Sequence, residues 1–333
     1  MRSAVLRAPR DFVIEDIDVP EIAPTEVLVR VVACGVCASE LDMWTGDTDR
    51  EFPIRVGHEP SGVVERVGSE VEGVLPGDPV ALFATEYGFS EYVAVDQRFV
   101  LQAGDLPLEL ALAEPVACAV NAVDLAHVRL GDDVLIVGAG FMGALVLKLV
   151  LMQGPRHVIV ADARREALER ARALGATHAI DVTREDLVER VREICDRVPA
   201  GIHDAGVDPL DETGVDVAFE ITGAQAPLDV LGDAVRMSGK LVVVGYHQGG
   251  TRTIPLGQWN YKALQLVNAH FREIATIMRG MRVAMRLLSS GRLRLDDLVT
   301  HRFPLDQIAD AFAVAHDKPE GFLKSTVLIG GDR

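Results

Sequence analysis

The chain has 333 residues, of which 49% are hydrophobic and 25% charged, and its acidic residues outnumber the basic ones 50 to 33, for a formal charge of -17. This balance excludes a disordered or fibrous protein, and the length favours two domains. The negative charge argues against nucleic acid or an anionic membrane surface as a partner. The four scattered cysteines, and an N-terminus without a secretory signal pattern, predict a cytoplasmic protein without a disulfide framework.

The first part of the chain has short β-rich runs separated by turn residues, among them EVLVRVVACGV, SGVVERVG, DPVALFA and SEYVAV. These runs predict a compact, mostly antiparallel domain over residues 1–115. From residue 116 to residue 268, strand and helix patterns alternate, through VLIVGAG, HVIVADA, a helix over 165–174, DVAFEI and KLVVVGY. This alternation predicts a parallel sheet with helices on both faces.

Two further segments complete the outline of the chain. Residues 194–216 are rich in Gly, Pro and Asp and have no useful period, so we expect a surface loop inside the second domain. Residues 269–333 return to a mixed pattern that ends in FLKSTVLI. We expect this last segment to complete the first domain.

A glycine motif at the start of the second domain predicts a dinucleotide site. Gly138, Gly140 and Gly143 form G-x-G-x-x-G between the apolar run VLIV and a helix. The first glycine permits a tight turn, and the second lets the backbone approach a pyrophosphate. The third lets helix and strand pack closely, while the helix N-terminus faces the anion.

The residues that follow bear on which cofactor binds. Asp162 ends the next strand, where its carboxylate would accept hydrogen bonds from the adenosine ribose hydroxyls. Arg164 and Arg165 point the other way, because a guanidinium there could bind a 2′-phosphate. We expect NAD rather than NADP, since the carboxylate would repel that phosphate. Gly245 follows the KLVVV strand and should lie near the nicotinamide.

Three separated segments offer side chains that bind metals. They contain Cys37 in ACGVCASELDMW, His58 with Glu59 in VGHEPSGVVERVGSEV, and Glu114 in LAEPVAC. Each alone has a simpler explanation, because a lone cysteine is usually a small buried hydrophobe and a Glu before Pro usually starts a helix. Their combination points to a metal site.

The segment GHEPSGVVERVGSEV resembles the zinc signature of the medium-chain dehydrogenase/reductase superfamily, and the stretch VTHRFPL also fits it. The resemblance covers essentially the whole chain. It is closest to polyol dehydrogenases of the sorbitol and threonine type, because Glu114 stands where alcohol dehydrogenases often have a cysteine. It implies an α/β fold in which a Rossmann doubly wound parallel sheet domain is inserted into a mostly β, GroES-like catalytic domain, and a homodimer or homotetramer.

The resemblance also implies the zinc ligands. Cys37 rather than Cys34 would bind the metal, because it comes two residues before a hydroxyl residue. Together with His58 and either Glu59 or Glu114, it leaves a fourth position for water or substrate, as catalytic zinc requires. Zinc would polarise an alcohol oxygen so that hydride can leave its carbon. No lobe of four close cysteines, the usual structural zinc site, is present, so we expect one zinc per chain.

Other roles follow from the same resemblance. Ser39 is expected to start a proton relay, and Asp42 stands where the family often has the relay histidine, so Asp42 or water would accept the proton. Lys324 resembles a basic residue that reaches the cofactor phosphates.

The substrate contacts are expected to include Trp44, Asn268 and His270, although Trp44 could equally belong to the core. These polar neighbours suit a secondary alcohol of a polyol, cyclitol or aminocyclitol. One alternative is a zinc-free, NADPH-dependent quinone or enoyl reductase of the same superfamily. Another is a catalytically silent nucleotide-binding protein, which the absence of the relay histidine would fit.

Overall fold

The computed structural model describes residues 1–84, 86–195, 213–247 and 250–330, and most of the loop predicted over 194–216 lies outside them. The chain forms two compact units, Met1–Ala117 with Arg272–Arg333 and Cys118–Phe271. The domains predicted over residues 1–115, 116–268 and 269–333 remain a prediction, because a compact unit in the fold need not fold on its own. In the described residues, no helix is long and apolar enough to cross a membrane.

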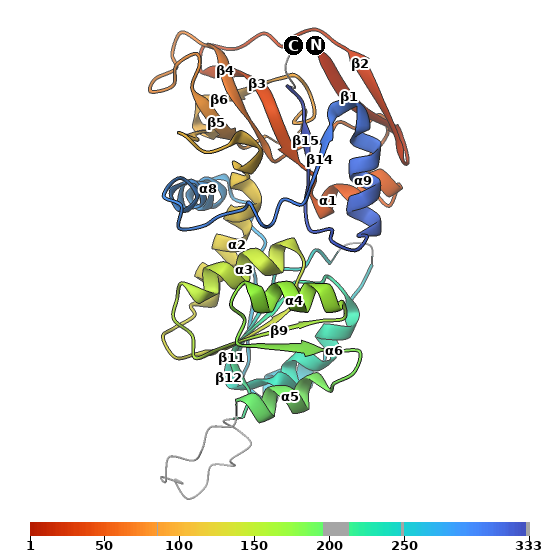
Figure 1. Cartoon of the computed structure of the whole chain (residues 1–333), viewed down its shortest axis with the longest axis vertical. Coiled ribbons are helices and arrows are strands. Elements are labelled where there is room, and N and C mark those ends of the chain that lie inside the picture. The colour runs from red at the N-terminus through yellow and green to blue at the C-terminus, as the bar shows by residue number, and fades with distance from the viewer. Residues whose placement is uncertain (85, 196–212, 248–249, 331–333) are drawn as a thin grey trace, which may run out of the picture. The chain divides into compact units, whose positions relative to one another are not determined.

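A seven-stranded sheet is the main element of the first unit in the part of the chain that the structure describes. Its order is β14-β15-β3-β4-β5-β7, and β6 also pairs with β3 (Figure 1). The pairs are antiparallel except for β14 with β15, while β1 and β2 form a separate antiparallel pair. The strands are β1 (Arg2–Ala8), β2 (Asp11–Asp16), β3 (Glu26–Gly35), β4 (Pro60–Val67), β5 (Pro79–Leu82), β6 (Tyr92–Asp96), β7 (Val100–Gln102), β14 (His301–Pro304) and β15 (Ser325–Leu328).

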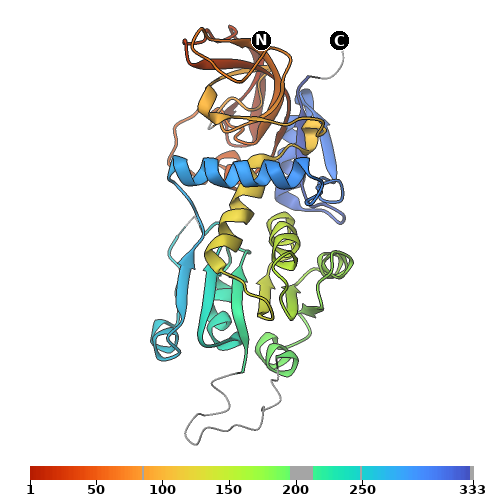
Figure 2. The ribbon, with the colours of Figure 1, turned by 90° about the vertical axis from the view of Figure 1, so that its left-hand side faces the viewer.

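The C-terminal segment joins this sheet through β15, which pairs with β3 so that Val327 lies opposite Cys34. Strand β3 is long and nearly all buried, because its β-branched residues suit a pleated surface that is covered on both sides. The described helices of this unit are α1 (Ala38–Thr45), the first residues of α2 (Ala113–Ala126), α8 (Ile274–Ser289) and α9 (Ile308–Asp317). Helix α8 is the long blue helix of Figure 2. Short 3₁₀ turns lie at Gln97–Phe99, Leu108–Leu110 and Leu305–Gln307.

Helix α1 was not predicted from the sequence. It has eight residues and buries only Glu40 and Trp44, so it lacks the apolar period that marks a helix. It begins after Cys37 and ends at Gly46, whose φ of 93° is the left-handed conformation common after helix ends.

The second unit contains a six-stranded sheet, within the described residues, in the order β10-β9-β8-β11-β12-β13. Every neighbouring pair is parallel, and helices flank the strands (Figure 1). The elements are β8 (Asp133–Val137), α3 (Phe141–Leu151), β9 (His157–Asp162), α4 (Arg165–Ala173), β10 (His178–Asp181), α5 (Leu187–Ile194), β11 (Val215–Glu220), α6 (Gln225–Ala234), β12 (Val235–Val243), α7 (Leu256–Tyr261) and β13 (Gln265–Asn268).

This strand order confirms the predicted doubly wound fold. Its direction of winding reverses between β8 and β11, and in such sheets ligands bind outside the carboxyl ends of the strands at that point. Strand β8 is buried along its whole length, which explains why it reads as an uninterrupted apolar run.

Candidate metal centre and dinucleotide site

Three of the predicted ligands come together in the first unit. The ligand atoms of Cys37, His58 and Glu59 all lie within 4.8 Å of one another. Cys37 caps the start of α1, while His58 and Glu59 directly precede β4. A thiolate, an imidazole and a carboxylate at this spacing suit zinc, which takes all three in tetrahedral sites.

A buried carboxylate orients the histidine of this cluster. Glu40 is 1% exposed and accepts hydrogen bonds from Gly57 N at 2.7 Å, Cys37 N at 3.2 Å and His58 Nδ1 at 2.9 Å. The lowered pKa of Glu40 makes it an ionised acceptor, and because a carboxylate can only accept, His58 Nδ1 carries the proton. This leaves His58 Nε2 to bind a metal, which is the usual arrangement of a carboxylate behind a ligating histidine.

The electrostatics of the cluster favour a cation beside the imidazole. Burial opposes ionisation of Glu40, but His58 and the two backbone N–H groups outweigh it and lower the pKa of the carboxyl. Burial likewise opposes charge on His58, but Glu40 and Cys37 raise the pKa of the imidazole well above its ordinary value. Negative partners on both sides of the ring therefore favour positive charge there, as a bound zinc ion would provide.

The carboxylate of Glu59 is held by a buried lysine. Lys324 Nζ lies 2.8 Å from Oε1 and 2.6 Å from Oε2, but only the Oε1 contact has hydrogen-bond geometry, and Lys324 also donates to Val36 O at 2.9 Å. No hydrogen bond from the described residues reaches the buried Oε2 atom. A Cβ at residue 35 would overlap Oε2, so any residue larger than glycine there would push the Glu59 carboxylate out of this position. A buried carboxylate in the cluster with Cys37 and His58, with one oxygen that accepts no hydrogen bond from the described residues, fits a metal ligand.

Of two further residues predicted near the metal, one lies beside the cluster and the other lies outside it. Glu114 lies at the start of α2 and is outside the cluster of Cys37, His58 and Glu59. Ser39 donates a hydrogen bond to Cys37 Sγ at 3.3 Å, so its hydroxyl is beside a proposed ligand.

Two more side chains of α1 had predicted roles. Burial and the neighbouring Asp47 raise the pKa of Asp42, which makes that carboxyl a better proton acceptor. Trp44 is 4% exposed and packs against Phe312 and His316 in the core of the unit, and its contact with a substrate stays a prediction. Lys324 pairs with Glu59 in the structure, and its contact with the cofactor phosphates stays a prediction.

The glycine motif of the second unit has the geometry that a dinucleotide requires. Gly138 has a φ of 105°, in the left-handed region, at the turn between β8 and α3. A Cβ at Gly143 would overlap the carbonyl oxygen of Gly138. A Cβ at Gly140 would have open space around it, and its nearest neighbour would be Arg164 Nη2 at 3.9 Å. This turn and the start of α3 therefore have the backbone shape that suits a bound pyrophosphate.

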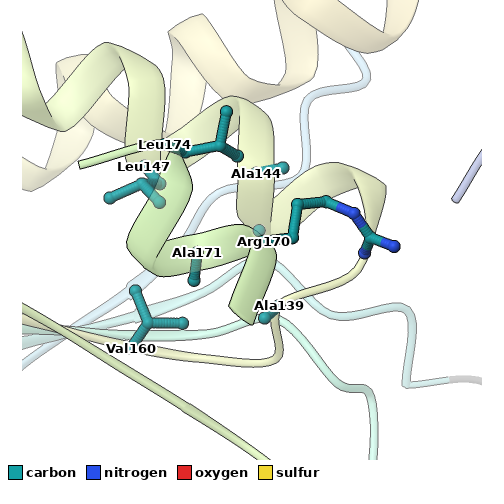
Figure 3. Close-up of a pocket in the computed structure, with 8 residues that line it drawn as sticks. Ala139, Ala144, Leu147, Val160, Arg170, Ala171 and Leu174 are labelled. Carbon is teal, nitrogen blue, oxygen red and sulfur yellow. The ribbon is translucent and has the colours of Figure 1, made fainter. Parts of the chain in front are cut away.

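A cavity of about 10 Å³ lies directly behind this motif, between α3 and α4. Figure 3 shows its labelled aliphatic side chains gathered together, while the guanidinium of Arg170 extends away from them. It holds at most about one water molecule. It is too small to hold any part of a nucleotide.

The predicted carboxylate and arginines lie beside the motif. Asp162 is buried and accepts hydrogen bonds from Ala139 N at 2.7 Å and from Arg164, whose N lies at 2.8 Å and Nε at 3.4 Å. The Arg165 side chain is 84% exposed and pairs with Glu169 on α4. Of the two predicted arginines, Arg164 is therefore the one whose side chain lies beside the glycine motif.

The residues predicted near the nicotinamide and the substrate, Gly245, Asn268 and His270, lie close together after strands β12 and β13. His270 Nε2 is 3.3 Å from Gly245 O, and Asn268 Oδ1 accepts from His270 N at 3.0 Å. Sequence reasoning missed the pair next to them, in which fully buried Glu220 faces His247 Nε2 at 2.6 Å. The sequence signal for this pair was weak, because Glu220 merely ends the apolar strand β11 and His247 comes shortly after β12.

Comparisons with known proteins agree with this geometry. The model described as "Alcohol dehydrogenase GroES-like domain" matches residues 23–105, and "Zinc-binding dehydrogenase" matches residues 142–289. Sorbitol dehydrogenase from Homo sapiens is 30% identical over 344 residues, covering 93% of this chain and 91% of that protein. L-threonine 3-dehydrogenase from Anaeromyxobacter sp. (strain Fw109-5) is 30% identical over 348 residues, covering 95% of each. The crystal structure of galactitol-1-phosphate dehydrogenase from Escherichia coli has a TM-score of 0.84 at 24% identity, covering 98% of this chain and 100% of that one.

Proposed function

This chain belongs to the medium-chain dehydrogenase/reductase family of zinc-dependent alcohol dehydrogenases, and on that premise we propose that it oxidises a secondary alcohol of a polyol, cyclitol or aminocyclitol with NAD. The observation that carries the proposal is the cluster of Cys37, His58 and Glu59 with its orienting carboxylate. Sorbitol and threonine dehydrogenases among its relatives support a polar substrate that carries several functional groups.

The protein would hold its metal through Cys37 Sγ, His58 Nε2 and a glutamate. Glu59 is the better candidate for the third ligand, because its carboxylate belongs to the cluster and its Oε2 accepts no hydrogen bond from the described residues, while Glu114 lies outside the cluster. Bound zinc polarises the alcohol oxygen, and bound NAD accepts the hydride. Glu40 keeps His58 in the tautomer that leaves Nε2 as an acceptor, and burial of Glu40 excludes water from this support.

The proton of the alcohol needs a path that the protein supplies. Ser39 Oγ lies next to Cys37 Sγ and would take this proton as the first relay group. Asp42, three residues further along α1, would receive it, and its raised pKa suits that role. We expect Ser39→Ala to lower kcat by about 10²-fold or more while the Kd for NAD changes little. Equal losses in kcat and NAD affinity would contradict a relay role.

The choice of NAD rests on Asp162. Its carboxylate beside the glycine motif would bind ribose hydroxyls and repel a 2′-phosphate. Arg164 partly offsets this repulsion, because its guanidinium contacts Asp162 and lies over Gly140. The ratio of kcat/KM with NAD to that with NADP measures the balance. Arg164→Gln should raise this ratio, and Arg165→Gln, with its exposed side chain, is the matched control.

We also propose that the chain forms a homodimer or homotetramer. Strand β13 is an edge strand of the described sheet, and Leu266 on it is 51% exposed. Two more apolar side chains, Tyr261 and Leu256, are 77% and 63% exposed just before it. An uncovered edge with apolar neighbours favours pairing with another copy. Light scattering coupled to size-exclusion chromatography measures the mass directly, and a 36 kDa particle would refute the proposal.

The decisive experiment for the function combines metal analysis with a substrate panel. The purified protein should contain about one zinc per chain and reduce NAD with at least one polyol, cyclitol or amino alcohol. Cys37→Ser should lose both the zinc and the activity, whereas Cys118→Ser, a matched control outside the cluster, should keep both. A metal-free wild-type protein that reduces quinones or activated alkenes with NADPH would overturn the zinc proposal. A protein that binds NAD without turnover would point to a silent nucleotide-binding protein.

A further inference from the structure

The second unit contains a polar cavity at the edge of the sheet opposite its glycine motif. The cavity has a volume of about 220 Å³. It lies at the amino ends of the strands, because Asp132 directly precedes β8, Asp216 is near the start of β11, and Lys240 pairs with the first residue of β13. The glycine motif follows the carboxyl end of β8. A ligand in this cavity would therefore not occupy the cofactor site.

Three basic side chains line the cavity: Arg129, Arg236 and Lys240. Arg236 Nε pairs with Asp216 Oδ1 at 2.7 Å, so that cation has a partner. The guanidinium of Arg129 makes no hydrogen bond or ion pair that involves a described residue. Lys240 Nζ donates to Leu125 O at 3.1 Å, which uses one of its three protons. The cavity thus presents more donors on cations than the protein's own acceptors satisfy.

The two carboxylates of the cavity do not neutralise these cations fully. Asp216 Oδ2 accepts from Asp133 N at 2.7 Å, in addition to the pair with Arg236. Asp132 Oδ2 accepts from Arg129 N at 2.8 Å and closes a turn with it. Asp132 therefore supports a backbone turn, Asp216 is shared between Arg236 and the backbone, and two carboxylates stand against three basic side chains.

The pKa of Lys240 is lowered, as expected where basic side chains outnumber carboxylates. Burial and the neighbouring Arg129 both lower the pKa of its ammonium, and Asp132 offsets them only in part. Two basic groups that repel each other across a cavity are stabilised by an anion placed between them.

The cavity wall also contains strained backbone. His127 and Ser238 both line it, with φ angles of 51° and 55°. Residues with a Cβ adopt this left-handed region rarely, and such strain gathers at binding sites. Here the two strained positions belong to separate segments, the residue after α2 and a residue inside β12, so a single turn does not explain both.

We propose that this cavity binds a small oxyanion with two negative charges, such as a phosphate, a phosphate ester or a short dicarboxylate, at a site separate from the cofactor. Its volume equals roughly seven water molecules, which suits a ligand of that size. The Arg129 guanidinium can meet two oxygens at once, and Lys240 contributes a point charge. Because the whole chain carries a charge of -17, its surface in general disfavours anions, so saturable binding that NAD leaves unchanged would reflect this local cluster.

Isothermal titration calorimetry on the zinc-loaded protein tests the proposal, with inorganic phosphate as the probe and potassium chloride at equal ionic strength as the blank. We expect one site per chain, with the same affinity in the presence and absence of saturating NAD. Lys240→Met and Arg129→Gln should each weaken phosphate binding tenfold or more. Arg184→Gln, a change of equal charge at a 78% exposed side chain of the same unit, should leave it unchanged.

Several results would overturn the proposal. One is the absence of binding heat above the chloride blank. Another is phosphate binding that NAD abolishes, which would place the anion at the glycine motif. A third is unchanged phosphate affinity in both Lys240→Met and Arg129→Gln. Parallel titrations with succinate distinguish the two kinds of ligand, because tighter binding of succinate indicates a dicarboxylate and tighter binding of phosphate a phosphate ester. None of these titrations depends on which alcohol the enzyme oxidises.

Discussion

Replacing Glu40 by glutamine tests the support of the metal centre most directly. The substitution keeps the shape of the side chain but removes its charge and one acceptor oxygen. In the structure, Oε1 accepts from Gly57 N and His58 Nδ1, and Oε2 accepts from Cys37 N. The amide nitrogen of glutamine would face one of these donors with a donor of its own. At least one buried N–H group would lose its partner.

The size of the effect follows from these contacts. A hydrogen bond to a charged group contributes about 1.5–3 kcal/mol. That energy corresponds to roughly a 10–100-fold change in an equilibrium constant, the same range as is found for partners behind ligating histidines. We therefore expect Glu40→Gln to weaken zinc binding about 10–100-fold, with a parallel loss of turnover at limiting zinc.

The assay is competition for zinc between the protein and a chromophoric chelator at one pH. Glu65→Gln is the matched control, because Glu65 is an exposed glutamate of the same unit, 4.0 Å from Arg30. Thermal unfolding of the metal-free variants shows separately whether Glu40→Gln alters the fold. Zinc affinity equal to that of the wild type would refute the reasoning, since the carboxylate would then not support His58.

Two further predictions concern packing and thiol chemistry. Gly143→Ala should lower the free energy of unfolding by about 1–3 kcal/mol and abolish NAD binding, because its Cβ would overlap the Gly138 carbonyl. Gly257→Ala is the control, because the space around Gly257 is open, and it should change neither quantity. Thermal unfolding and NAD titration measure the two effects. Burial and the nearby Asp133 raise the pKa of Cys195 to about 12, so at pH 8 only about one thiol in 10⁴ is ionised. Mass spectrometry after iodoacetamide should therefore find Cys195 unlabelled, and Cys37 labelled only after a chelator has removed zinc; labelling of Cys195 in the folded protein would contradict this.

Local sequence patterns were sufficient where one segment contains the whole signal. The motif from Gly138 to Gly143 could be predicted, because its turn, its close backbone approach and its helix start lie within six residues. The alternation of strand and helix over 116–268 likewise predicted a parallel sheet, since each element shows its own period. These features depend on neighbours in the chain and need no knowledge of distant contacts.

The sequence alone supplied the ligand types of the metal centre, but the tertiary structure decided how they are held. Glu40 lies on a helix too short to show a period, and only the folded chain brings it to His58, 18 positions away. The pairing of Lys324 with Glu59 joins residues 265 positions apart through the pairing of β15 with β3. The core position of Trp44 was undecidable from its type, because an aromatic side chain suits a pocket and a core equally.

The polar cavity at the amino ends of the strands of the second unit likewise could not be predicted from the sequence. Arg129, Arg236 and Lys240 are ordinary surface residues in the sequence, and they meet only because parallel strands align their amino ends at one edge. Sequence by itself determined the elements and the chemical types available to each site, since local spacing specifies both. Which side chains face one another was decided by strand order and packing, because these contacts join segments that are far apart in the chain.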